Sequence, residues 1–333
     1  MKWVCILVSL ISLSLVTGCS KVKPAATHSH TQNSTLAPLG SLQQCQQYSG
    51  LPEAWQNSKT AGMVWIPEGS FQLGSNLAYP DELNFGQAQR QVTGFWIDQT
   101  EVTVAQFSSF VKATGYITDA EKQKQAAVFS PDVDNPKQWW QLKSDYTWKT
   151  PNGAQGQPPL PSEPVRYVTK NDAEHYAVWL GRDLPTEQEW EYAAKAGSKS
   201  DTPLHQAPQD THQHPQANYW QGEFPFDNTV EDHFQSVAPV GCYASNAFKL
   251  FDMIGNVWEW TSSAYHGAHD QHMGNYAELR QQNSTATQYV LKGGSFLCAS
   301  NFCARYRNSS RYPQEFDLAA THVGFRTILR TVE

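Results

Sequence analysis

The sequence is poor in charge and has no excess of basic residues. Charged side chains make up 17% of the 333 residues, and 24 lysines and arginines stand against 31 aspartates and glutamates, a net charge of −7. A nucleic-acid-binding protein needs a basic surface to meet phosphates, so this balance argues against one. Hydrophobic residues make up 40% of the chain, which is ample for a folded core and argues against a disordered chain.

Several patterns are also absent. The sequence shows no heptads and no short internal repeat, which excludes coiled coils and solenoids. It has no glycine-rich phosphate loop after a strand and no Gly-x-Ser-x-Gly elbow, so neither nucleotide binding nor serine-hydrolase chemistry is indicated. What it has instead is 12 Trp, 14 Tyr and 15 Phe beside 21 Gly and 19 Pro. Such a composition predicts a domain that buries large rings between many turns.

The N-terminus resembles a lipoprotein signal. An apolar run at residues 3–16 follows Lys2 and is too short for a lasting membrane helix. It closes on Leu15-Val16-Thr17-Gly18-Cys19, which resembles a bacterial lipobox and implies cleavage before Cys19 and lipidation of its thiol. Because Ser20 and no Asp follows, we expect an exported lipoprotein on the periplasmic side of the outer membrane. An ordinary signal peptide is the alternative.

Composition divides the chain into three parts. We assign residues 1–18 to the signal peptide, 19–60 to a flexible tether rich in Ser, Thr, Gln, Ala and Pro, and 61–333 to one domain. The tether contains one predicted short helix around Leu42 to Tyr48. No linker interrupts residues 62–333.

Of the six cysteines, four are available for disulfides or metal binding in the mature protein. Cys5 leaves with the signal and Cys19 carries lipid, which leaves Cys45, Cys242, Cys298 and Cys303. In an oxidising compartment two structural disulfides would be the simplest interpretation. A Cys45–Cys242 bridge is one option, but nothing in the sequence fixes it.

Short helices and strands are predicted along the domain. Thr186, with Glu189 three residues later, forms a capping box that begins a helix running to about Ala196. Apolar residues at helical spacing after Thr103 predict another helix, ended by Gly115. The remaining expectations are strands at 63–67, 69–74 and 92–97, a helix capped by Thr169 or Asn171, a long polar loop at 119–160, and loop with short strands at 198–333. The predicted fold class is α+β with little regular secondary structure.

Five motifs resemble the landmarks of one superfamily. They are Gly62-Met63-Val64-Trp65-Ile66-Pro67-Glu68-Gly69-Ser70-Phe71, Glu101-Val102-Thr103, Arg182-Asp183-Leu184-Pro185-Thr186-Glu187-Gln188-Glu189-Trp190-Glu191, Gly255-Asn256-Val257-Trp258-Glu259-Trp260 and Gly324-Phe325-Arg326. On these residues the chain resembles the formylglycine-generating enzyme, or sulfatase-modifying factor, superfamily over about residues 62–327. The resemblance implies one C-type-lectin-like domain. It identifies the fold rather than the activity, because the same fold serves iron-dependent sulfoxide synthases, a pyoverdine-maturing periplasmic protein and lectin-like binders.

The activity expected from the resemblance rests on Cys298 and Cys303, which lie in a segment similar to the catalytic strand and loop of formylglycine-generating enzymes. Two thiolates are soft ligands that suit Cu(I). The resemblance implies that the pair binds copper and that O2 oxidises a Cys in a Cys-x-Pro-x-Arg type motif of an unfolded or nascent sulfatase to formylglycine. Ser295 and Trp258 match a hydroxyl and an aromatic ring near the metal. The alternative is a Cys298–Cys303 disulfide.

Two oxygen-rich clusters resemble the structural calcium sites of the family. Hard oxygen ligands at this density suit Ca²⁺. The first cluster comprises the side chains of Asn218 and Asp232 and the carbonyls of Tyr219 and Phe234. The second comprises Asp252, Gly255, Val257 and Glu259. Two hydrogen-bonded turns without an ion are the alternative.

The chain departs from the animal enzymes at His322, where they have Asn, and at Phe302, where Tyr is frequent. His322 falls near the substrate groove of the family, so the resemblance does not carry over a motif preference. The leading function is therefore sulfatase maturation. The alternatives are a periplasmic oxidase of the same fold that acts on a siderophore or small thiol, and a non-catalytic binding lipoprotein.

Overall fold

The structure is a computed structural model that describes residues 39–84, 89–131, 139–199, 202–204, 206–267 and 287–331. The predicted signal peptide, the lipidation site Cys19 and the tether up to residue 38 lie outside these ranges. Within them, no helix has the length and apolarity needed to cross a bilayer.

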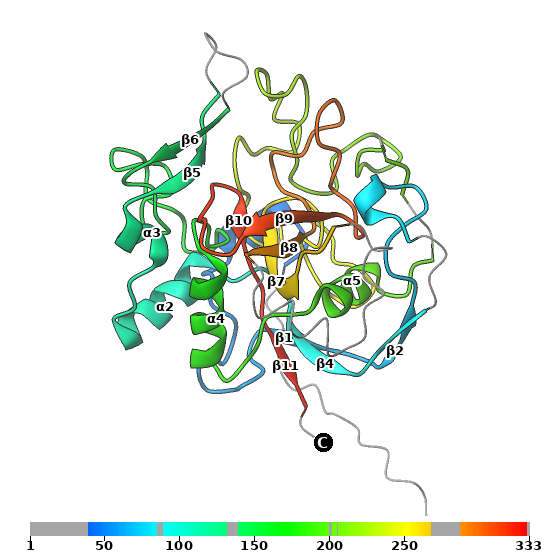
Figure 1. The fold of residues 1–333 in the computed structure, drawn as a ribbon, viewed down its shortest axis with the longest axis horizontal. Helices are drawn as coiled ribbons and strands as arrows, with labels where there is room; N and C mark the ends of the chain where they lie inside the picture. Colours follow the sequence, from blue (N-terminus) through cyan, green and yellow to red (C-terminus); the bar gives the residue numbers. More distant parts are fainter. Residues whose placement is uncertain are drawn as a thin grey trace, which may run out of the picture. The chain divides into compact units, whose positions relative to one another are not determined.

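Four small β-sheets form the frame, and the largest lies in the middle of Figure 1. It has the order β10-β7-β8-β9, with β7 antiparallel to β8, β8 antiparallel to β9, and β10 parallel to β7. In the three-stranded sheet β4 lies between β1 and β11, so both ends of the domain meet there. The pairs β2–β3 and β5–β6 complete the set. The strands are β1 Met63–Ile66, β2 Gly69–Phe71, β3 Arg90–Val92, β4 Phe95–Asp98, β5 Ala126–Phe129, β6 Trp140–Lys143, β7 Trp258–Ala264, β8 Gln288–Lys292, β9 Arg311–Glu315, β10 Val323–Gly324 and β11 Ile328–Arg330.

Helix starts follow one rule in four helices. A threonine caps each of them: its hydroxyl accepts a hydrogen bond from the third helical N–H, and its own backbone N–H donates to the side-chain oxygen of that third residue. The helices are α1 Leu42–Gln47, α2 Val104–Thr114, α3 Asp119–Gln123, α4 Lys170–Trp179 and α5 Glu187–Lys195, with a 3₁₀ turn η1 at Pro80–Glu82. The α+β class, the caps Thr103 and Thr186, and the stop at Gly115 are confirmed.

Two local expectations need correction. The segment expected as one strand at 92–97 is divided between β3, which ends at Val92, and β4, which begins at Phe95. Gly94 lies between them, where a Cβ would be 2.4 Å from the Trp65 ring. The region 119–160, expected to be a loop, contains α3 and the β5–β6 hairpin. The hairpin is stable there because Ala126 and Val128 are buried in one cluster with Tyr167.

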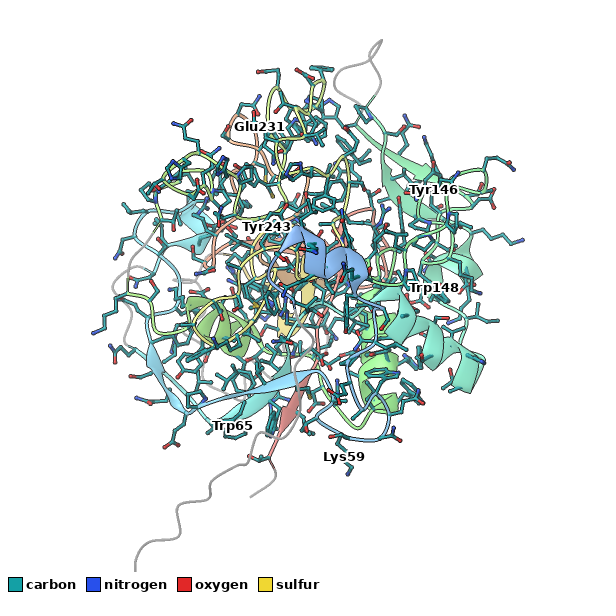
Figure 2. The ribbon with its side chains drawn as sticks, turned by 180° about the vertical axis from the view of Figure 1, so that it is seen from behind. Lys59, Trp65, Tyr146, Trp148, Glu231 and Tyr243 are labelled. Atoms are coloured by element: carbon teal, nitrogen blue, oxygen red, sulfur yellow. A yellow bond between two sulfur atoms is a disulfide. The ribbon has the colours of Figure 1, made fainter. Side chains whose placement is uncertain are left out.

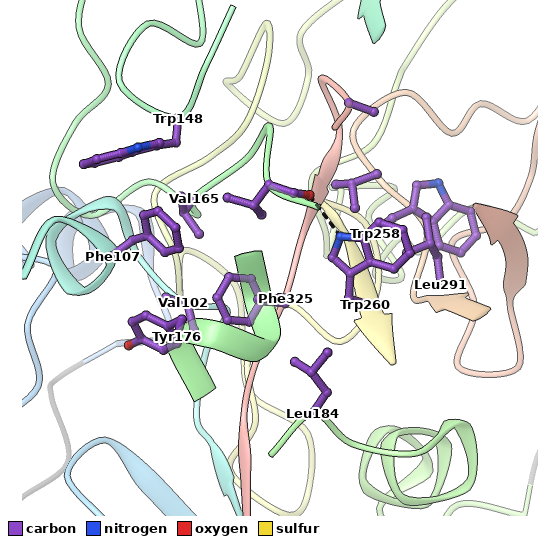
Figure 3. Packing of buried hydrophobic residues seen from close by; sticks show 14 of the residues in the cluster. Val102, Phe107, Trp148, Val165, Tyr176, Leu184, Trp258, Trp260, Leu291 and Phe325 are labelled. Carbon is purple, nitrogen blue, oxygen red and sulfur yellow. Dashed lines mark hydrogen bonds between the residues drawn. The ribbon is translucent and has the colours of Figure 1, made fainter. Parts of the chain in front are cut away.

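Aromatic rings fill the main core, which Figure 3 shows from close by. Phe107 stacks on Tyr176 with ring centroids 5.9 Å apart, and Trp260 donates its indole N–H to the Val168 carbonyl at 3.0 Å. Burying each such ring contributes roughly 1.5–3 kcal/mol. Cys298 belongs to the same cluster, so the segment that carries it, which follows β8 and is not itself a strand, is fixed to the centre of the domain.

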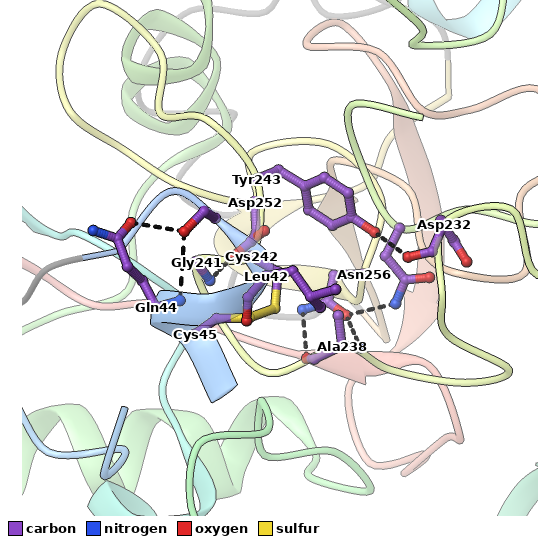
Figure 4. The surroundings of a disulfide bond; sticks show 12 residues. Leu42, Gln44, Cys45, Asp232, Ala238, Gly241, Cys242, Tyr243, Asp252 and Asn256 are labelled. Atoms are coloured by element: carbon purple, nitrogen blue, oxygen red, sulfur yellow. Dashed lines mark hydrogen bonds between the residues drawn. A yellow bond between two sulfur atoms is a disulfide. The ribbon is translucent and has the colours of Figure 1, made fainter. Parts of the chain in front are cut away.

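A disulfide ties the N-terminal segment to the domain (Figure 4). Cys45 in α1 is bonded to Cys242, 197 residues along the chain, and the Gly40 N–H donates to the Gly241 carbonyl at 2.8 Å. Tyr243, beside α1 in Figure 2, donates to the Asp232 carbonyl at 3.2 Å. The body of the domain therefore begins before residue 61, the boundary expected from composition.

Buried ion pairs connect the sheets and helices. We call the pairs Arg326–Glu259, Arg182–Asp98, Arg311–Glu187 and Lys292–Glu191 the ionic framework; in each, the shortest N–O distance is 2.7 Å. Glu259 accepts from Arg326 at both oxygens and also from the Trp190 indole. Such bidentate pairs fix geometry as well as charge.

Candidate active site

The segment after β8 turns sharply before it reaches the two thiols. Gly293 and Gly294 adopt φ values of +96° and +85°, which disfavour residues with a side chain. A Cβ at Gly294 would also lie 2.2 Å from the Arg305 carbonyl oxygen. These glycines therefore let the start of the segment pack directly against its end, and the loop that carries the cysteines is closed.

Cys298 and Cys303 are free thiols that contact each other. Cys298 is 2% exposed, and the Ser295 N–H points at its sulfur from 3.4 Å. The hydrogen bond from the Cys298 thiol, followed by the Arg305 charge, lowers the pKa of Cys303. Burial raises the pKa of Cys298. The pair therefore combines a thiol donor with a partner that ionises readily.

Acidic side chains of η1 hold the end of this loop in place. Arg305 forms ion pairs with Asp81 at 3.0 Å and with Glu82 at 2.6 Å. Arg307 reaches the other oxygen of Glu82 at 2.6 Å. The buried Glu82 carboxylate thus joins two arginines that follow Cys303, which restricts the position of its sulfur.

The thiols lie in the wall of a cavity of about 440 Å³. Trp258 and Ser295 line the same cavity, so the structure brings together all four residues expected at the reaction centre. Ser295 is fully buried and its hydroxyl oxygen accepts from the Leu297 N–H at 3.3 Å. None of the described lining residues is Asp, Glu, Lys or Arg.

Aromatic side chains form the rest of the wall. Phe302 is 52% exposed and stacks on Phe224 with centroids 4.7 Å apart. Trp140 on β6 is 40% exposed and contacts the His322 ring at 4.8 Å. Tyr312 is likewise half-exposed. An apolar, open wall of this kind suits an extended peptide more than a highly charged ligand.

Sequence reasoning did not place Trp140 and Tyr312 at the site. For Trp140 the sequence offers one signal, which is the cluster Trp139, Trp140 and Trp148 in the otherwise polar region 119–160. His322 was expected near the groove and does line the cavity. Burial lowers its pKa to about 3, so the imidazole is neutral at physiological pH. It offers hydrogen bonding without charge.

The first oxygen cluster brings its four expected residues together. The Asp232 carboxylate accepts from the backbone N–H groups of Tyr219 at 3.2 Å and Phe234 at 3.0 Å. The Gln221 amide donates to both the Tyr219 carbonyl and Asp232. The buried Asn218 carbonyl oxygen Oδ1 has no hydrogen-bond partner in the described ranges. A buried oxygen without a partner needs a donor or a cation, but the Gln221 amide already occupies the Tyr219 carbonyl and the Asp232 carboxylate.

The second oxygen cluster is arranged differently from the expectation. Glu259 is occupied by Arg326 and Trp190, as described above, while Asp252 accepts from the Gly241 N–H at 2.5 Å. Glu101 was not anticipated here. Burial, followed by the Asp252 charge, raises its pKa, and its Oε2 has no partner among the residues described. Across the described chain, no group of three or more His, Cys, Asp or Glu has metal-holding geometry.

Both oxygen clusters are joined to the thiol segment through the backbone. The Asn256 N–H donates to the Asn218 carbonyl at 2.8 Å, and the Gly255 N–H donates to the Gly293 carbonyl at 3.0 Å. The Phe296 N–H then donates to the Asn256 carbonyl at 2.9 Å. A change in either cluster would therefore be transmitted to the residues just before Cys298.

A family model described as the sulfatase-modifying factor enzyme 1-like domain matches residues 48–331. The formylglycine-generating enzyme of Mycobacterium tuberculosis (strain ATCC 25618 / H37Rv) is 37% identical over 292 residues, which cover 80% of this chain and 97% of that protein. The chain belongs to the sulfatase-modifying factor family. The resemblance stated from its motifs is therefore confirmed.

Family membership leaves the activity open. A Bos taurus protein named inactive C-alpha-formylglycine-generating enzyme 2 is 34% identical over 288 residues, which cover 81% of this chain and 88% of that one. The structure of PvdO from Pseudomonas aeruginosa matches with a TM-score of 0.57 and 24% identity, covering 82% of this chain and 96% of that chain. This structural likeness shows the fold alone. Activity must therefore be argued from the residues of the site.

Proposed function

We propose that this family member oxidises a cysteine in a Cys-x-Pro-x-Arg type motif of a sulfatase to formylglycine, using O2 and Cu(I). One observation carries the proposal: Cys298 and Cys303 are free, in contact with each other, and open to an aromatic cavity. A binding module would have no need to keep two thiols reduced in an oxidising compartment, where a disulfide is the favoured state.

The donor set fits Cu(I), because two thiolates are soft ligands and the metal accepts two of them. Bound there, copper would supply the site where O2 is activated. Cys298 and Cys303 would hold the metal, and the Arg305 charge near Cys303 favours the ionised sulfur that a metal requires. Trp258 is buried and supplies an apolar ring to the wall of the same cavity.

The aromatic wall would position the substrate polypeptide. Trp140, Phe302 and Tyr312 present exposed ring surface around the thiols, and rings give large contact area at low cost in side-chain entropy. The neutral His322 ring offers a hydrogen-bonding edge to a peptide group. Ser295 is buried, its N–H points at the Cys298 sulfur, and its hydroxyl holds the thiol segment through the Leu297 N–H.

Two structural Ca²⁺ ions are part of the proposal. The Asn218–Asp232 cluster has an unpartnered oxygen, and the Glu101–Asp252 pair puts two buried carboxylates side by side. Calcium at either place would neutralise buried negative charge and hold the loops bonded to the thiol segment.

We also propose that the protein works outside the cytoplasm as a lipoprotein anchored through Cys19. The Cys45–Cys242 disulfide is consistent with export. The protein's substrate there would be a nascent or still unfolded sulfatase.

The deciding experiment uses the mature chain loaded with Cu(I), mixed with a Leu-Cys-Thr-Pro-Ser-Arg peptide under oxygen. We expect the peptide mass to fall by the difference between a CH2–SH and an aldehyde group. The same peptide with Ser in place of Cys is the substrate control. Absence of conversion by copper-loaded protein would refute sulfatase maturation, and conversion by Cys298→Ser would refute the assignment of the thiols.

A further inference from the structure

Arg166 differs from the other buried arginines of the domain. It is 4% exposed, as buried as Arg182 and Arg307. Arg182, Arg307, Arg311 and Arg326 each form an ion pair with a carboxylate. Arg166 forms none with any described residue, and the field of Glu163 reaches it only from beyond ion-pair distance. A buried guanidinium without an acidic partner is unusual because desolvation of the charge is costly.

The guanidinium also has unused donors. Its Nη2 donates to Asn152 Oδ1 at 2.9 Å, and its Nη1 makes a long contact of 3.5 Å with the Thr321 carbonyl. Its Nε has no partner in the part of the chain that the structure describes. The guanidinium carbon lies 5.7 Å from the centre of the Tyr167 ring, which offsets part of the charge. Arginine has five N–H donors and keeps its proton in a protein, so donors remain for an acceptor that carries negative charge.

Arg166 lines a second cavity, of about 510 Å³, behind the thiol cavity. The two cavities share Leu297 in their walls, and β5 separates them: Ala127 faces the thiol cavity while Val128 faces the second. Phe129, Trp220 and Phe226 supply apolar surface there. Arg166 is the one charged residue in the described lining, so the site suits a single negative charge on an apolar body.

We propose that this second cavity is an anion subsite in which Arg166 binds a carboxylate attached to an apolar group. An acidic residue of a polypeptide and a free organic acid share that chemistry. A phosphate dianion fits less well, because one cation must balance it. Leu297 immediately precedes Cys298, so an occupant of the subsite lies next to the segment that carries the thiols.

The test uses benzoate as the probe and benzamide as its uncharged counterpart. Binding is measured by calorimetry on the wild-type chain and on Arg166→Met, which should fold because an unpaired buried charge is replaced by an apolar chain of similar length. Benzoate should bind the wild type at least about tenfold more tightly than the variant, as loss of a charge-assisted hydrogen bond predicts. Arg166→Lys should fall between them. Equal benzoate affinity in wild type and Arg166→Met, equal binding of benzamide, or no benzoate binding to wild type would each overturn the proposal.

Two further measurements show whether the carboxylate belongs to a polypeptide or to a free organic acid, and distinguish the anion subsite from the oxidase activity. A set of Cys-x-Pro-x-Arg peptides carrying Glu or Gln at successive positions is bound to the wild type and to Arg166→Met. A preference of about tenfold for one Glu peptide, lost in the variant, would assign the subsite to a polypeptide. Benzoate binding without such a preference would assign it to a free organic acid. Cys298→Ser should keep full benzoate affinity, so failure of the subsite is distinguishable from failure of the oxidase.

Discussion

The thiol cavity and the ionic framework treat charge in opposite ways. The described residues that line the thiol cavity include no Asp, Glu, Lys or Arg, whereas the framework buries four acid–base pairs. Buried pairs are costly to desolvate but specify geometry well, because each partner has a fixed position. The difference suggests a division of labour: paired charges hold the loops, and apolar rings leave the reaction centre accessible to a polypeptide.

Removing a thiol should have the largest effect of all, which is a loss of oxidation activity. We expect Cys298→Ser and Cys303→Ser to lose about a thousandfold or more of peptide oxidation, as losing an essential group does. The matched control is Cys45→Ser with Cys242→Ser, which should cost about 2–5 kcal/mol of stability and little activity below the melting temperature. Peptide mass and calorimetric unfolding measure the two effects. A thiol variant that oxidises normally would contradict the comparison.

Breaking an ion pair of the ionic framework should lower the free energy of unfolding. Arg326→Met leaves the Glu259 carboxylate buried without its bidentate partner, so unfolding free energy should drop by about 3–5 kcal/mol. The double variant with Glu259→Leu should recover part of the loss, because no unpaired charge remains. Denaturant titration provides the values. Stability unchanged in Arg326→Met would show that the framework does not hold the fold.

Calcium removal should have an intermediate effect. If free calcium stands a hundredfold above its dissociation constant, chelation should cost about 2.7 kcal/mol. Asp232→Asn should lose part of this calcium-dependent stability, while Glu68→Gln, at an exposed acid in the turn between β1 and β2, should retain it. Melting temperature with and without chelator measures the difference. If the melting temperature of the wild type does not change with chelator, both oxygen clusters are hydrogen-bonded turns without an ion.

The smallest expected effect is a difference in alkylation rate between the two thiols of the metal-free protein. The pKa of Cys303 lies below its usual value and that of Cys298 above it, so at neutral pH Cys303 carries more thiolate. Since the thiolate is the nucleophile, iodoacetamide should modify Cys303 about tenfold faster, with the gap narrowing as pH rises and both ionise. Peptide mapping after timed alkylation reports each rate. Faster reaction at Cys298 would reverse the order of ionisation described here.

The sequence predicted those parts of the protein that depend on local rules. Thr103 and Thr186 begin helices because capping needs only a threonine and a partner three residues later. The motif resemblance placed Cys298, Cys303, Ser295 and Trp258, and the structure gathers them at one cavity.

Other features depend on contacts between distant segments and could not be predicted in this way. Trp140 reaches the cavity only because β5 pairs with β6 and Ala127 packs on Ala320. Glu101 meets Asp252 through tertiary packing across 151 residues (252 − 101). The lack of an acidic partner for Arg166 also depends on tertiary packing, because residue spacing in the sequence does not show which side chains surround a buried arginine.

The central claim is that Cys298 and Cys303 together bind one copper ion. Native mass spectrometry of the mature chain, loaded with Cu(I) in the presence of a competing thiol, tests it directly. We predict a gain of one copper in the wild type and none in Cys298→Ser or Cys303→Ser. Copper retained by Cys298→Ser or by Cys303→Ser, or absent from the wild type, would contradict this claim.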